Sequence, residues 1–486
     1  MNVLAVDQGT SATKALVLCP QRGVLAEAEV PVHPRPVPGG GVEQDPEELW
    51  ASVVQAGGLA LARAGEPVAA VGLANQGETV LAWDRTSLRP LSSALSWQDR
   101  RAASVCERPA LADRADALAA LTGLPLDPYF AAPKITWLRE QVTREGVATT
   151  SDAWLLARLT GGGAFATDAA TASRTLLLDL DRVEWAPAAC EAFGVDPAEL
   201  PAIVDCAGPV GETSAFAAGT PLPVTGLAVD QQAALFAEAC LAAGEAKCTY
   251  GTGAFLLTTV GSTPRRSASG LVGCVAWRLG GATTWCLDGQ VYTVGSAVGW
   301  LREIGLIAEA ADLDRIGGQA EGSGGAAFVP GLAGLGAPFW APNARGAFTG
   351  LSLATSRAQL VRAVVEGIAA QVAWLARAAG DDLGKPLERL RVDGGLTRSA
   401  LLMQVQADLL QAPVEVYPSP NATALGVAAL ARLGAGLAAS AAEATAGWTP
   451  AATYEPRIGP AEAEERLRRW RAAAEATLAL GLGTDG

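Results

Sequence analysis

The chain has 486 residues, of which 50% are apolar and 18% are charged. This length and composition suit two or more domains with large cores and exclude a disordered chain. Lysine and arginine number 36 against 50 aspartates and glutamates, a net charge of −14, and the sequence has no Lys/Arg-rich run, so we expect no nucleic-acid binding.

The predicted elements begin with a strand, a polar turn and a second strand. An apolar strand over Asn2–Val6 leads into the turn Asp7–Lys14, and a second strand covers Ala15–Cys19. A helix begins after Asp45, with this residue as N-cap and proline at the first helical position. Another apolar strand is predicted over Val68–Leu73.

Near the middle of the chain this layout repeats. A strand over Ala246–Tyr250 enters a Gly-Thr-Gly turn, and a β-rich run over Phe255–Val260 follows. Two such openings predict a duplicated α/β domain with a cleft between the halves, and two unrelated hairpins are the alternative. We place the halves at residues 1–242 and 243–486.

The second half continues with alternating helices and strands. Apolar residues at helical spacing predict a helix over Ser356–Ala379 that Gly380 stops. A strand over Leu390–Val392, a turn over Asp393–Gly395 and a helix over Ser399–Leu410 follow. The class is therefore α/β.

Histidine and cysteine usage narrows the chemistry. His33, the only histidine, lies in a Pro/Gly-rich stretch where we expect a surface position, so acid–base chemistry must come from carboxylates. Eight scattered cysteines without a C-x-x-C pair predict reduced core thiols. No secretory signal pattern and no window of about 18 uninterrupted apolar residues are present, so we expect a soluble, cytoplasmic protein.

The turns at the strand ends offer groups that a phosphate site needs. No G-x-x-x-x-G-K-[ST] loop is present, which excludes a P-loop enzyme. In the first turn, glycine permits close backbone approach, Thr10 and Ser11 offer donors, and Lys14 adds a cation. Asp7 at the strand end would suit a hydrated Mg²⁺. A polar hairpin without a ligand explains this turn alone equally well.

Read together, seven segments resemble the FGGY family of carbohydrate kinases, and its glycerol kinase branch in particular. In family order and spacing they are Asp7–Ser11, Ser96–Arg101, Pro125–Phe130, Asp230–Phe236, Tyr250–Gly253, Gly334–Trp340 and Arg391–Gly395. The second family signature, from Gly346 through Glu366, fits throughout, and the first, around Tyr129–Gln141, fits except at Ala131. The resemblance implies two duplicated actin/hexokinase-like (ribonuclease H-like) ATPase domains with an interdomain cleft. Residues 1–242 would bind the acceptor substrate and part of the phosphate, and residues 243–486 would bind the nucleotide.

The resemblance also implies a function and a site. The implied reaction is ATP-dependent phosphorylation of a hydroxyl of a small polyol or sugar, with Mg²⁺. Asp230 would be the general base, and Asp7 and Asp230 would hold the metal. The implied phosphate and nucleotide residues are Thr10, Ser11, Lys14, Gly251, Thr252, Gly295, Gly395 and Ser399. The implied acceptor residues are Glu78, Trp97, Tyr129, Asp230, Gln231 and Phe255. The partners are thus the acceptor and ATP or ADP; whether two copies form a homodimer is left open.

Plain structural interpretations compete with these roles, and one position departs from the branch. Trp97 and Phe255 would otherwise be core aromatics, Glu78 a solvated carboxylate and Asp230 a helix cap. Gly77 stands where glycerol kinases carry an arginine. Losing that donor and its bulk predicts a larger pocket, and hence a larger polyol or sugar or weak glycerol binding.

Within the family, a ketose or other polyol kinase (of the xylulose, ribulose or erythritol type) is the alternative. The segment Asn75–Thr79 favours the glycerol kinase branch, because xylulokinases typically carry Met-His there. A nucleotide switch of the actin type would leave Glu78, Trp97 and Tyr129 unexplained. A sugar sensor without catalysis is disfavoured by the intact pair of predicted metal-binding aspartates. Adenine selectivity is open, because Gly299 and Ser399 replace amide residues.

Overall fold

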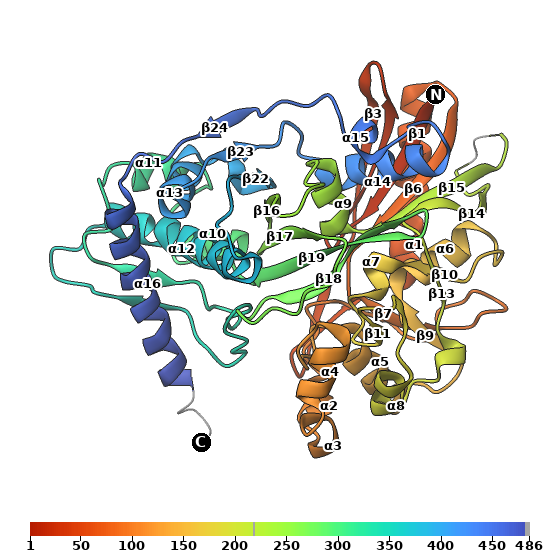
Figure 1. Cartoon of the computed structure of the whole chain (residues 1–486), viewed down its shortest axis with the longest axis horizontal. Coiled ribbons are helices and arrows are strands. Elements are labelled where there is room, and N and C mark those ends of the chain that lie inside the picture. The colour runs from red at the N-terminus through yellow and green to blue at the C-terminus, as the bar shows by residue number, and fades with distance from the viewer. Residues whose placement is uncertain (217–218, 482–486) are drawn as a thin grey trace.

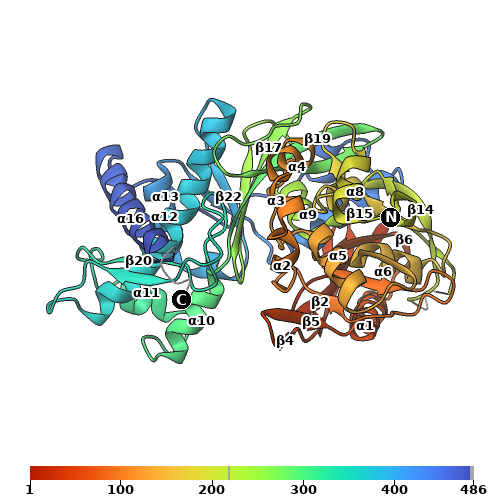
Figure 2. The same ribbon diagram turned by 90° about the horizontal axis from the view of Figure 1, so that it is seen from below.

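The computed structural model describes residues 1–216 and 219–481. Two α/β halves lie side by side and share one 13-stranded sheet (Figures 1 and 2). In the first half, β1 (Asn2–Gln8), β2 (Ala12–Cys19) and β3 (Gly23–Pro31) form an antiparallel meander. Beside β1, β6 (Val68–Asn75) and then β15 (Leu222–Val229) continue the sheet as parallel strands.

The second half repeats this arrangement. A hairpin of β16 (Ala246–Tyr250) and β17 (Ala254–Gly261) is followed by β22 (Leu390–Asp393) and β23 (Val414–Val416), which lie parallel to β16. Each half thus places two parallel strands beside the first strand of a hairpin, as the predicted duplication requires. Two unrelated hairpins would not share this layout.

The halves differ on the far side of each hairpin. In the second half, β19 (Ala282–Val291) pairs with β17, and β18 (Val272–Leu279) lies outside it. The outer strand β18 meets β14 (Ala207–Thr213) of the first half through one residue pair, Ala207 with Leu279. The large sheet is therefore continuous across the two halves.

The remaining strands form smaller sheets or the far edge. One sheet has the order β4-β5-β8-β7-β9, made by Arg35–Val37, Gly41–Gln44, Ala94–Leu95, Val80–Trp83 and Val147–Thr150. Three pairs are β10–β13 (Ala166–Asp168, Ala202–Val204), β11–β12 (Leu178–Asp179, Glu184–Trp185) and β20–β21 (Ala327–Val329, Ala347–Thr349). The edge strand beside β23 is β24 (Ala452–Tyr454).

The helices connect and cover these strands. Those of the first half are α1 (Pro46–Ala64), α2 (Ala103–Cys106), α3 (Pro109–Ala112), α4 (Ala115–Thr122), α5 (Ala131–Gln141), α6 (Ser151–Leu159), α7 (Ala169–Ala172), α8 (Pro187–Phe193) and α9 (Asp230–Ala237). The others are α10 (Gly295–Glu303), α11 (Asp312–Gly317), α12 (Arg357–Leu383), α13 (Ala400–Leu410), α14 (Ala422–Gly434), α15 (Ala441–Ala444) and α16 (Pro460–Gly481).

The structure tests two predicted helix ends, the start of α1 and the end of α12. Asp45 caps α1 as predicted, because its Oδ1 accepts a hydrogen bond from the Glu47 N–H at 2.9 Å. Gly380, however, does not stop α12. The helix runs one turn further to Gly384, whose φ of 74° provides the left-handed ending that the prediction assigned to Gly380. The prediction was wrong because Gly380 is buried within the helix, where its lack of a side chain allows close packing, so this glycine does not mark the helix end.

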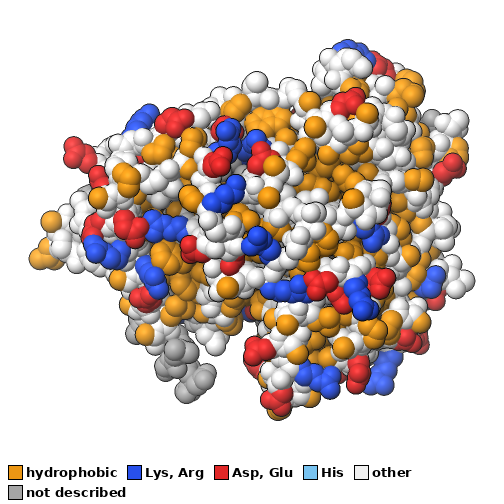
Figure 3. Space-filling model, viewed as in Figure 1, with side chains coloured by type: hydrophobic (Ala, Val, Ile, Leu, Met, Phe, Trp, Pro, Cys, Tyr) orange, Lys and Arg blue, Asp and Glu red, His pale blue; other side chains and the backbone are white. Residues whose placement is uncertain are grey.

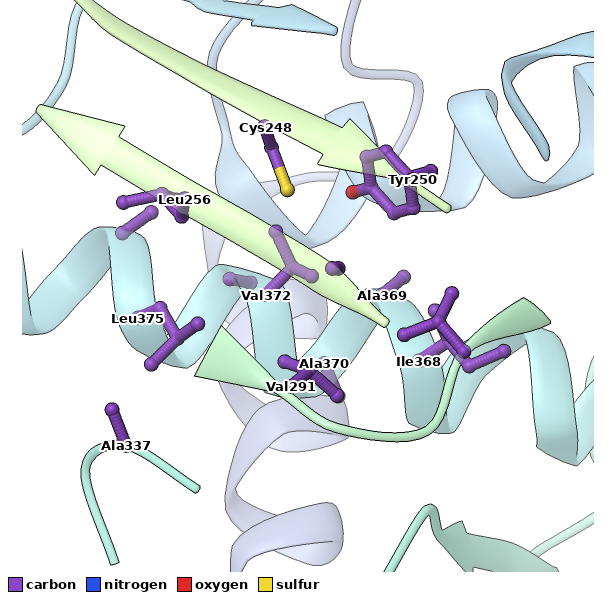
Figure 4. Packing of buried hydrophobic residues seen from close by; sticks show 14 of the residues in the cluster. Cys248, Tyr250, Leu256, Val291, Ala337, Ile368, Ala369, Ala370, Val372 and Leu375 are labelled. Atoms are coloured by element: carbon purple, nitrogen blue, oxygen red, sulfur yellow. The ribbon is translucent and has the colours of Figure 1, made fainter. Parts of the chain in front are cut away.

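The largest core lies between α12 and the second-half sheet. Figure 4 shows Ile368, Val372 and Leu375 of α12 near Leu256 and Val291 of the strands, all of them at most 1% exposed. By length and composition α12 would suffice to cross a membrane, yet 67% of its apolar window is buried within the protein. The apolar character of α12 is thus accounted for by core packing.

The chain order and the packing units do not coincide. The helix α14 follows β23 in sequence but packs on β1, β6, β15 and α9 of the first half (Figure 1, blue beside red). Glycines permit this approach: a Cβ added to Gly426 would lie 1.8 Å from the Ala233 carbonyl oxygen. The last third of the chain therefore helps to hold the strands that carry the candidate site.

Surface and thiol predictions agree with the structure. The His33 side chain is 67% exposed and pairs with Glu48. All eight cysteines are free thiols, and all but the half-buried Cys106 are buried. On the face shown in Figure 3, acidic and basic side chains are interspersed rather than gathered into a cationic patch.

Candidate active site

The two predicted carboxylates, Asp7 and Asp230, lie at the carboxyl ends of parallel strands of the large sheet. Asp7 lies near the end of β1 opposite Ala74, and Asp230 directly follows β15, whose last residue Val229 lies opposite Asn75. Both strands flank β6, so the two backbones are about 10 Å apart, within reach of converging side chains. Burial, then the charges of Asp230 and Asp393, raise the pKa of Asp7 to about 7 despite the opposing charge of Lys14.

A cavity of about 150 Å³ lies between the two halves; Asp230 lines it, whereas Asp7 is not among its lining residues. The first half lines it with Thr10, Gly77, Glu78, Trp97, Tyr129, Arg174, Val229, Asp230, Gln231 and Gln232. The second half contributes Thr249, Gly251, Thr252, Phe255 and Asp288. The cavity thus brings together every predicted acceptor residue and three of the predicted phosphate residues.

Aromatic rings form one side of this cavity. Trp97 meets Tyr129 and Phe255 edge to face, with centroids 6.0 Å apart in both pairs. The Trp97 indole N–H donates to Thr10 Oγ1 at 2.9 Å, which ties the aromatic rings to the turn Asp7–Lys14. Trp97 and Phe255 are half-buried: they pack against the hydrophobic core and also border the cavity. Such rings suit the C–H face of a polyol.

A buried charge network also lines the cavity, next to the Tyr129 ring. Arg174 Nε donates to Glu78 Oε1 at 2.6 Å, and Arg174 Nη1 lies 2.8 Å from Asp288 Oδ2. The three side chains are 3–5% exposed, so Glu78 is not a solvated carboxylate. Burial raises the pKa of Glu78 and of Asp288, and the Arg174 guanidinium opposes both shifts.

The sequence reasoning missed Arg174 and Asp288. Their signal was weak: each is a single charged residue within an otherwise buried segment, which requires an ionic partner but does not identify it. Asp288 Oδ1 has no hydrogen-bond partner among the described residues, although Asp288 lines the cavity. This oxygen is therefore free to accept a further hydrogen bond.

The predicted base has the environment that general base catalysis needs. Burial and the charge of Glu78 raise the pKa of Asp230 to about 6, against the opposing charge of Lys247. Its Oδ1 accepts the N–H of Gln231 at 2.7 Å. The helix-cap interpretation is wrong, because Asp230 is itself the first residue of α9 and the cap position is Val229.

The Gly251–Gly253 turn, predicted to bind phosphate, is held by close backbone packing. The N–H of Gly295, at the start of α10, donates to the Gly251 carbonyl at 3.0 Å. A Cβ at Gly295 would lie 2.5 Å from that oxygen, so only glycine fits. Gly295 therefore shapes the turn that carries Gly251 and Thr252.

Other predicted nucleotide residues lie outside the cavity. Ser11 is exposed, and Lys14 lines a separate 390 Å³ cavity with Arg398. Gly395 begins a short 3₁₀ turn after β22. Ser399 caps α13, and its hydroxyl donates to Asp314 Oδ1 at 2.5 Å, so this hydroxyl already has a structural partner.

Gly77 lines the cavity beside Val229. A Cβ at this position would lie 2.9 Å from Val229 Cγ2, closer than real Cβ contacts. Val229 therefore occupies the space directly beside Gly77, and the larger pocket relative to an arginine-bearing site stays a prediction.

The residues present fit Mg²⁺ bound with phosphate. In the described part of the chain, no three histidine, cysteine or acidic side chains gather closely enough to form a metal cage. Mg²⁺ commonly takes only one or two carboxylates, with water and phosphate oxygens completing its shell. The half-buried carboxylates of Asp7 and Asp230 supply that number.

Comparisons with known proteins match both halves of the chain to one family and find relatives that cover nearly all of it. Residues 2–237 and 246–435 match the N-terminal and C-terminal domains of the FGGY family of carbohydrate kinases. Glycerol kinase of Thermus brockianus is 44% identical, with 97% of this chain and 98% of that protein covered. Glycerol kinase of Alkalilimnicola ehrlichii is 42% identical, with 97% of each covered. Among solved structures, Plasmodium falciparum glycerol kinase with ADP superposes with a TM-score of 0.89 at 28% identity, over 98% of both chains.

Proposed function

Since the chain belongs to the FGGY family of carbohydrate kinases, we propose that it transfers the terminal phosphoryl group of ATP to a hydroxyl of glycerol. It is a phosphotransferase with an alcohol group as acceptor. The observation that carries the proposal is the interlobe cavity, which joins the Asp230 carboxylate, the acceptor wall of Glu78, Trp97 and Tyr129, and the Gly251 turn.

In the proposed reaction, Asp230 accepts the proton of the attacking hydroxyl. The hydroxyl oxygen then bonds to the terminal phosphorus of ATP, the bond from this phosphorus to the bridging oxygen breaks, and ADP leaves. Asp7 and Asp230 would hold Mg²⁺, which neutralises phosphate charge when bound. Thr10, Gly251 and Thr252 would surround the transferred phosphate.

On the acceptor side, the cavity offers both polar acceptors and aromatic rings. Glu78 and the free Oδ1 of Asp288 would accept bonds from the remaining hydroxyls, and Arg174 fixes the positions of both carboxylates. The carbon skeleton would lie against Trp97 and Phe255. Glycerol is favoured over a ketose by the similarity to glycerol kinases, which are 42–44% identical over nearly the whole chain.

The test is Asp230→Asn, assayed by coupled ADP release with glycerol and Mg²⁺-ATP. We expect kcat to fall about 10²–10⁴-fold because the amide cannot accept the hydroxyl proton. Asp113→Asn, at an exposed position, serves as the control and should match the parent. A panel of dihydroxyacetone, erythritol, ribitol, xylulose and ribulose tests the ketose alternative. Equal rates for Asp230→Asn and the parent would rule out Asp230 as the base.

A further inference from the structure

Gly77 and Val229 line the same part of the acceptor cavity, one beside each functional carboxylate. Gly77 directly precedes Glu78, and Val229 directly precedes Asp230. Among the described residues, Val229 Cγ2 is the one atom that a Cβ at Gly77 would meet within 4 Å outside the adjoining residues, at 2.9 Å. The absence of a side chain at 77 and the presence of the Val229 isopropyl group are therefore parts of one packing arrangement.

Neither partner can give way without moving a functional group. Val229 is 3% exposed, and its β-branched side chain has few alternative rotamers. On the other side, the Thr79 N–H donates to the Gly77 carbonyl at 2.7 Å in a tight turn that holds Glu78 at φ 54°. A side chain at 77 would thus displace Val229 with Asp230, or this turn with Glu78.

We propose that Gly77 and Val229 act as a matched pair that sets acceptor specificity, by presenting an apolar wall where position 77 offers no hydrogen-bond donor. The inference rests on the proposed kinase function and extends it to small vicinal diols, with a methyl or C–H group directed at Val229.

The expected tolerance of the diol follows from how a binding site discriminates between acceptors that differ by one hydroxyl. A site rejects an analogue that lacks a hydroxyl mainly when a buried polar group is then left unpaired, whereas an apolar wall discriminates weakly. At Val229 a missing hydroxyl leaves no protein group unpaired. The carboxylates of Glu78, Asp230 and Asp288 still meet the other hydroxyls.

The experiment is a double-mutant cycle with glycerol and propane-1,2-diol as acceptors. Using the full chain with Mg²⁺-ATP, ADP release is measured for the parent, Gly77→Ala, Val229→Ala and the double variant. We expect the parent to use the diol with kcat/KM within about tenfold of glycerol. Gly77→Ala should lower kcat/KM for both acceptors by about tenfold or more, because its Cβ displaces Val229 or Glu78.

Val229→Ala should separate the apolar contact of Val229 with the acceptor from its packing contact with position 77. Val229→Ala alone should weaken the diol more than glycerol, by about tenfold, because two methyl groups of apolar contact are lost. The double variant should recover most of the Gly77→Ala loss, a coupling of at least about fivefold. Gly58→Ala, where a Cβ meets nothing within 4 Å, is the matched control and should behave as the parent.

Several outcomes would overturn the inference. If the parent's kcat/KM for glycerol exceeds that for the diol by more than about a hundredfold, the apolar side chain of Val229 does not permit the diol. Losses in the double variant that simply multiply show that the two residues are independent. Thermal unfolding of each variant checks folding, and if Gly77→Ala does not fold, the glycerol-to-diol ratio of Val229→Ala decides. A parent that phosphorylates neither acceptor refutes the proposed function itself rather than this pair alone.

Discussion

Replacing Arg174 with methionine is the most informative perturbation of the site. The side chain is 3% exposed and contacts Glu78 at 2.6 Å and Asp288 at 2.8 Å, so its removal leaves two buried carboxylates without a cation. Breaking a buried ion pair in this way costs about 3–5 kcal/mol of unfolding free energy. Without the cation, the Glu78 and Asp288 carboxylates that line the cavity would repel each other. Acceptor binding should therefore weaken as well.

The pH dependence supplies a sharper signature. Burial raises the pKa of Glu78 and Asp288, and without Arg174 both pKa values should rise further. A carboxyl group whose folded pKa lies above its unfolded value stabilises the fold at low pH, and this contribution is lost as pH rises through the folded pKa. The stability deficit of Arg174→Met should therefore be smaller in acidic than in alkaline buffer.

Urea unfolding and glycerol kinetics across pH measure both effects. Arg174→Lys should give an intermediate loss, since a lysine keeps the charge but not the fork that bridges two carboxylates. Arg108→Met removes an exposed partner of Glu140 and should leave stability unchanged within error. The reasoning would be refuted if Arg174→Met behaved like this control, or if its deficit did not vary with pH.

Two further predictions concern buried positions away from the acceptor wall. Glu238 is fully buried with both carboxylate oxygens unpartnered among the described residues, and burial and Asp393 hold its pKa well above its ordinary value. Glu238→Gln should therefore unfold with the same or about 1 kcal/mol higher free energy than the parent, with the gain growing as pH rises; a clear loss at neutral pH would mean that Glu238 is ionised. Gly426→Ala should lower the unfolding free energy by about 1–3 kcal/mol or more because its Cβ would enter the Ala233 carbonyl, whereas Gly58→Ala should raise it by about 0.4–1 kcal/mol; equal urea midpoints would contradict the packing of α14.

Much of the fold was predictable because its signals are local. The strand–turn–strand openings of both halves, the Asp45 cap and the apolar stripe of α12 depend on residues a few positions apart. The error at Gly380 has the same origin: a glycine marks a helix end only when its neighbours leave it in solvent, and here tertiary packing buries it. Likewise, the sequence indicated which carboxylates to expect at strand ends, since parallel strands bring those ends to one edge.

What only the tertiary structure decided are the contacts between segments distant in sequence. The partners of Glu78 could not be read from its neighbours, because Arg174 and Asp288 reach it from other elements. The space beside Gly77 depended on Val229, which a sequence places next to Asp230 but not next to residue 77. Periodicity and motifs specify which face a residue presents along its own element, whereas the packing of elements sets which side chains meet and how much room remains between them.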